Sequence, residues 1–105
     1  MALYLVTYEL NRPGSFYPAL FKRIESAGAA WHLMETTWFV QTDLSSTQLA
    51  DRIKDALDAT DKLVVCKVTS DSAWWALKYS ESEWLKHGVA AQSAEPVFEM
   101  ELALG

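Results

Sequence analysis

Three polar residues near expected strand ends carry the side chains that metal binding or proton transfer needs. Glu9 and Asn11 lie just before a Pro-Gly turn, and His32 follows a tryptophan in a short apolar run. Carboxylate and amide oxygens suit Mg²⁺ or Mn²⁺, so Glu9 and Asn11, with one carboxylate from each of two copies, are the candidate metal ligands. His32 is a candidate for proton transfer or base stacking, and Glu9 and His32 are thus the candidate catalytic pair. For Glu9 the alternative is a solvated strand-end acid or a partner for Arg12 or Lys67, and for His32 it is a hydrogen-bonded structural histidine.

Length and composition predict one folded domain. The chain has 105 residues, half of them hydrophobic, and a formal net charge of −5. Binding to nucleic acid through counterion release needs clustered lysine and arginine, and this acidic balance disfavours it. We expect no membrane span, because no apolar run approaches about 20 residues. We also expect no signal peptide and a cytoplasmic protein, since the single cysteine, Cys66, fits a reducing compartment as an inert core residue.

Hydrophobic periodicity predicts an α+β fold. The expected elements are strand 2–10, helix 15–27, strands 30–34 and 37–43, helix 46–58 and strand 62–69. Ser45 and Gln48 have the spacing of a capping box at the start of the second helix. The apolar run 63–68 is continuous, as in a strand that is covered on both faces. This order is the ferredoxin-like βαββαβ arrangement, with both helices on one face of an antiparallel sheet.

Beyond that unit we expect an appended helical segment at 71–88, a connector at 89–96 and a final strand at 97–104. Residues 1–88 then form the domain, and 89–105 its connector and strand. One face of this strand is apolar, and it consists of Phe98, Met100, Leu102 and Leu104. Burying those four side chains is worth roughly 6–12 kcal/mol at most, while ordering the backbone costs about 8–16 kcal/mol. We therefore expect the strand to pair with a sheet edge, in its own copy or in a second copy.

Five tryptophans are many for this length. Trp74 and Trp75 are adjacent, and neighbours on a helix point about 100° apart, so one of them is the better candidate for a contact surface. Tryptophan is enriched in protein–protein hot spots and also stacks on single-stranded bases. Without an accompanying basic groove, the sequence favours a protein partner.

Several short motifs stand out between residues 3 and 87. They are Tyr8-Glu9-Leu10-Asn11-Arg12-Pro13-Gly14, Tyr17, Gly28, Trp31-His32, Thr37-Trp38 and Asp43-Leu44-Ser45. Together they resemble a family of small bacterial and phage proteins often labelled SinR-like, and the resemblance covers roughly residues 3–87. The resemblance implies a fold like that of the small CRISPR-adaptation nucleases and the virulence-associated ribonuclease toxins, which are ferredoxin-like homodimers.

In those proteins an aspartate at the end of the first strand lies near the dimer axis and is implicated in metal-dependent phosphodiester cleavage. That position is Glu9 here. Glutamate keeps the charge but adds a methylene, and a displacement near 1 Å can cost about 100-fold in rate. The sequence therefore favours a homodimeric, non-catalytic adaptor or inhibitor in a mobile-element or defence context. The alternative is a metal-dependent nuclease or ribonuclease toxin with paired Glu9 residues.

Overall fold

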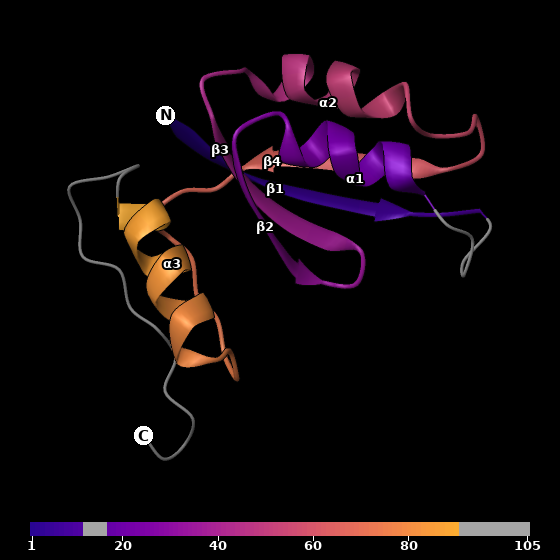
Figure 1. Ribbon diagram of the computed structural model, residues 1–105. Coiled ribbons are helices and arrows are strands. Elements are labelled where there is room, and N and C mark those ends of the chain that lie inside the picture. Colours follow the sequence, from indigo (N-terminus) through magenta and orange to yellow (C-terminus); the bar gives the residue numbers. More distant parts are fainter. Residues whose placement is uncertain (12–16, 91–105) are drawn as a thin grey trace. The chain divides into compact units, whose positions relative to one another are not determined.

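The computed structural model describes residues 1–11 and 17–90. Its elements are β1 (Ala2–Glu9), α1 (Pro18–Glu25), β2 (Ala29–Met34), β3 (Thr37–Thr42), α2 (Ser46–Lys54), β4 (Lys62–Lys67) and α3 (Tyr79–Ala90). The chain divides into two compact units, residues 1–67 and 68–105. The first unit contains the whole sheet with α1 and α2, and the second contains α3 (Figure 1).

The first unit is a four-stranded sheet in the order β2-β3-β1-β4, and every neighbouring pair is antiparallel. Both helices of this unit lie on one face of the sheet (Figure 1). The strands and helices between residues 2 and 67 lie within a few residues of the ranges that the sequence predicts. The protein is thus α+β. The predicted final strand, 97–104, lies outside the described residues.

The core lies between the sheet and the two helices. The fully buried members from β1 and β3 include Val6 and Val40, and those from the helices are Leu20, Ile24, Leu49 and Ile53. Alternation along β1 sends every second residue into this core, as the period-two pattern predicts. The opposite face of the sheet carries the other set, including Glu9 of β1 and Val64 of β4. On that face Glu9 and Val64 are exposed, whereas Leu3 of β1 is fully buried.

Gly28 connects α1 to β2 at a point where the backbone of β3 passes very close. A Cβ atom at this position would overlap the carbonyl oxygen of Gln41. The helix itself ends earlier, at Glu25. Glycine is therefore needed at position 28 for the close approach of the two backbones.

The capping box at the start of α2 is confirmed. The Gln48 backbone N–H donates to Ser45 Oγ at 3.1 Å, and the Ser45 N–H donates to Gln48 Oε1 at 2.9 Å. Two N–H groups at the start of the helix are thereby satisfied. This local signal fixes where α2 begins and therefore how it lies over β4.

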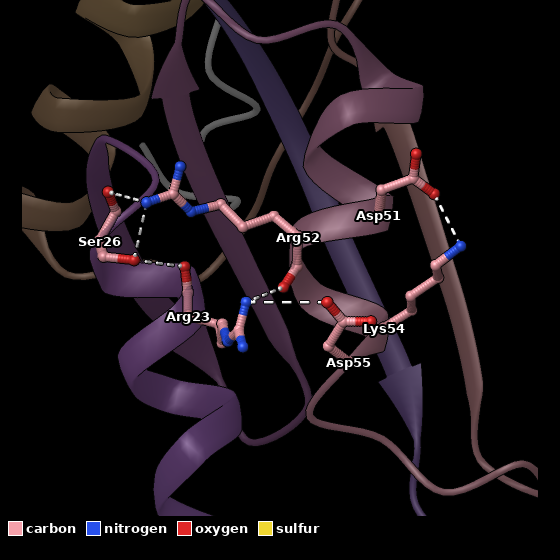
Figure 2. Close-up of polar contacts among 6 residues, drawn as sticks. All are labelled: Arg23, Ser26, Asp51, Arg52, Lys54 and Asp55. Atoms are coloured by element: carbon pink, nitrogen blue, oxygen red, sulfur yellow. Dashed lines mark hydrogen bonds and ion pairs between the residues drawn. The ribbon is translucent and has the colours of Figure 1, made fainter.

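The C-terminal ends of α1 and α2 are joined by two arginines that reach in opposite directions (Figure 2). Arg52 Nη2 donates to the carbonyl oxygen and the hydroxyl of Ser26, both at 3.3 Å. Arg23 Nη1 donates to the carbonyl oxygen of Arg52 at 3.4 Å and lies 3.9 Å from Asp55 Oδ2. Each helix thus supplies a cation to the carbonyl end of the other, where the helix dipole favours positive charge.

In the second unit, the predicted helical segment 71–88 is only partly helical. The helix α3 begins at Tyr79 and continues beyond the predicted end at Gly88, to Ala90. The residues before it are not helical, and Ala76 has a φ of 65°, which is incompatible with an α-helix. The backbone N–H of Lys78 donates to Glu81 Oε1 at 2.9 Å, and this bond caps the start of the helix.

Candidate functional site

Glu9 is the last residue of the central strand β1, on the face of the sheet away from the helices. Its side chain is 76% exposed, and Glu9 Oε2 lies 3.8 Å from Lys62 Nζ. An exposed pair at that distance is weak. The carboxylate is therefore accessible, as a metal ligand would need to be, while the neighbouring lysine supplies a competing positive charge.

The backbone of Asn11 is hydrogen-bonded to an aspartate from a distant loop. Its N–H donates to Asp61 Oδ1 at 2.6 Å, and Asp61 Oδ2 accepts the N–H of Asp58 at 2.8 Å. Asp61 therefore ties the loop after β1 to the loop before β4. Within residues 1–11 and 17–90, no group of three or more histidine, cysteine or acidic side chains could hold a metal ion. Glu9 and Asn11 of one copy thus supply an incomplete set of ligands.

His32 of β2 lies in an aromatic cluster with Trp38 of the neighbouring strand β3 and Phe21 of α1. Its imidazole stacks on Trp38 with ring centres 4.2 Å apart and planes 7° apart, and Phe21 meets both rings edge-on. His32 Nε2 is 2.9 Å from the carbonyl oxygen of Glu35. These contacts fit the structural alternative for His32, because the ring is oriented by stacking and one nitrogen is already hydrogen-bonded.

Tyr8 and Trp38 connect this cluster to the core. The indole Nε1–H of Trp38 donates to the Tyr8 hydroxyl at 3.1 Å, and both side chains are buried. Burial raises the pKa of Tyr8 above its ordinary value of 10.0, the hydrogen bond from Trp38 lowers it, and the Glu35 charge raises it. The phenol therefore stays protonated near neutral pH and acts as a fixed acceptor for Trp38.

The adjacent tryptophans of the second unit separate as expected, one buried and one exposed. Trp74 is 8% exposed and donates from Nε1 to Ser82 Oγ at 3.0 Å. Trp75 is 59% exposed, and Tyr79, the first residue of α3, is 80% exposed. The sequence placed both Trp74 and Trp75 among the candidate interface residues. Trp74 belongs to the local core, and Trp75 is the contact candidate.

The edge strand β4 exposes apolar side chains that the sequence placed in the interior. Val64 is 52% exposed, and Cys66, expected to be an inert core residue, is also exposed. The continuous apolar run predicted cover on both faces, but β4 is an edge strand with helix cover on one face alone among the described residues of the first unit. Met34, at the end of the other edge strand, is 56% exposed.

Four predicted interface residues, Phe98, Met100, Leu102 and Leu104, lie outside the described residues. Sequence reasoning missed Tyr79 and Val64. Tyr79 is the first residue of α3 and is followed by the polar residues Ser80 and Glu81, and this setting gave a usable signal for its exposure. Val64 is exposed because β4 is an edge strand. The residues of β4 do not show by themselves that the strand lies at an edge.

Comparisons with protein-family models, with curated proteins and with solved structures found no match. In the described part of the chain, the helices are too short or too polar to cross a membrane.

Proposed function

We propose that this protein is a homodimeric adaptor or inhibitor that acts by binding another protein. The observation that carries the proposal is Trp75, which is 59% exposed although its neighbour Trp74 is buried and hydrogen-bonded. Large aromatic side chains contribute most of the free energy at many protein interfaces. Leaving one in water has no benefit for the stability of the chain itself.

The proposed fold is ferredoxin-like. It is supported by the order βαββαβ in residues 2–67, by the antiparallel strand order β2-β3-β1-β4 and by two helices on one face. The resemblance to small bacterial and phage proteins supports a mobile-element or defence context, and the single cysteine supports a cytoplasmic location. Both belong to the proposal.

The homodimer is proposed to form at β4. This edge strand spans Lys62–Lys67 without a proline, and its outer backbone groups suit pairing with another strand. The other edge, β2, has an irregular register between His32 and Met34, which discourages pairing. We propose that residues 97–104 of a second copy complete the sheet at β4.

A metal-dependent nuclease remains the second candidate, because the Glu9 carboxylate is 76% exposed at the end of a central strand. In that function Glu9 from each copy would bind Mg²⁺ or Mn²⁺ beside Asn11. Its single described ion pair, with Lys62, is long enough for a metal to compete with it.

The experiment is affinity capture from the native host with three versions of the full chain. The native chain and Met34→Ala, which changes a similarly exposed side chain, are expected to retain the same protein. The double variant Trp75→Ala/Tyr79→Ala is expected to lose it, at unchanged circular dichroism. Equal capture by all three would contradict the proposal. In parallel, Mn²⁺-dependent cleavage of RNA or DNA by the native chain, lost in Glu9→Gln, would establish the nuclease instead.

A further inference from the structure

The exposed aromatic residues Trp75 and Tyr79 lie on a short, constrained turn. Ala76, between them, has a φ of 65°, a conformation that costs a non-glycine residue roughly 1–3 kcal/mol. On one side of Ala76, the turn is anchored by the Trp74–Ser82 hydrogen bond, and on the other by the Lys78–Glu81 hydrogen bond. This backbone strain is therefore retained by contacts that hold Trp74 inward while Trp75 faces solvent.

The same turn carries a fixed negative charge. Glu81 Oε1 accepts the Lys78 N–H at 2.9 Å, which holds this carboxylate in the first turn of α3. Trp75 and Tyr79 are four residues apart, so at most about 14 Å of chain separates them. Lys78 lies between them, and its positive charge repels a cationic partner. The chain as a whole has a net charge of −5, which attracts one.

Two exposed aromatic side chains and a held carboxylate within residues 75–81, on an acidic protein, complement a planar cation. Arginine stacks on tryptophan and tyrosine and pairs with carboxylates, and it is more weakly hydrated than lysine. We propose that the turn around Trp75 and Tyr79 binds an arginine-bearing basic segment of a partner protein. This inference rests on the proposed function and names the chemistry of the partner.

The test is isothermal titration calorimetry of the full chain with three short synthetic peptides of equal length. One alternates arginine with glycine, one lysine with glycine and one leucine with glycine. We expect the arginine peptide to bind more tightly than the lysine peptide and to weaken with added salt. Trp75→Ala should weaken its binding roughly 2- to 30-fold, which corresponds to the usual range for a cation–π contact.

Two variants keep the result interpretable. Trp75→Phe retains an aromatic face and should fall between the native chain and Trp75→Ala, and Met34→Ala should bind as the native chain does. Unchanged affinity in Trp75→Ala, equal binding of arginine and lysine peptides, or tighter binding of the leucine peptide would overturn the inference. Because capture from the host is a separate measurement, a partner retained through Trp75 without arginine selectivity would overturn the inference and leave the proposed function standing.

Discussion

A buried hydrogen bond between Tyr8 and Trp38 supports the end of the sheet where Glu9 and His32 lie. Trp38 in turn supports the stacked imidazole of His32, and Phe21 closes the cluster from α1. Alternation along β1 was sufficient to place Tyr8 and Glu9 on opposite faces. The partner of the Trp38 indole was not predictable, because the register between β1 and β3 is set by the assembled sheet.

At this residue scale, Tyr8→Phe should change the response of stability to pH. The folded-state pKa of Tyr8 is raised, chiefly by burial, above its ordinary value of 10.0. The folded chain therefore binds this proton more tightly, and the resulting stability is complete below that value and is lost as pH rises through the folded-state pKa.

We expect the free energy of unfolding of the native chain to fall as pH rises above about 10 and through the raised folded-state pKa of Tyr8, and to fall less steeply in Tyr8→Phe. Near neutral pH the variant should be less stable by about 1–3 kcal/mol, since the Trp38 N–H loses its acceptor. Urea unfolding at several pH values measures both effects. Tyr79→Phe, which removes a phenol that is 80% exposed, is the control. Parallel curves for all three chains would show that Tyr8 does not contribute.

At the scale of elements, local signals predicted where helices and strands lie in the sequence. They did not predict which other elements each one packs against. The Ser45–Gln48 capping box fixed the start of α2 within one residue. The helical pattern over 71–88 was wrong in its first half, because Trp74 folds back to bond Ser82 and Ala76 adopts a positive φ. The apolar run of β4 predicted a strand correctly but not its place at the edge, which depends on pairing with β1 and on the absence of a further described neighbour.

The proposed pairing at β4 predicts a cysteine cross-linking pattern. Leu57, Leu63 and Val65 form a half-buried apolar flank on the helix side of β4, so the apolar face of residues 97–104 should lie on that side. Glu99 and Glu101 of that segment should then lie on the same face as Cys66 and Lys62. Strands pair about 4.8 Å apart, within reach of a disulfide.

We therefore expect Glu99→Cys or Glu101→Cys to form a disulfide with Cys66 on mild oxidation, and Met100→Cys and Leu102→Cys to form none. The product should have the mass of two chains on a non-reducing gel and should vanish when Cys66→Ser is added. Equal cross-linking of cysteines at positions 99, 100, 101 and 102 would contradict strand pairing. A cross-linked product with the mass of one chain would instead place the segment at its own β4.

At the scale of the whole molecule, the net charge of −5 disfavours binding to nucleic acid, which needs clustered lysine and arginine. The sequence was sufficient for the α+β class and for the separation of Trp74 from Trp75. The sequence alone did not suggest the proposed arginine-bearing partner. That proposal depends on the turn in the second unit that carries Trp75, Tyr79 and Glu81.

We propose that two copies of the chain act together by binding another protein. Native mass spectrometry of the full chain, purified gently from its own host, tests this proposal. We expect a species that contains two copies of the 11.8 kDa chain and at least one further protein. A spectrum that shows only the single 11.8 kDa chain would contradict it.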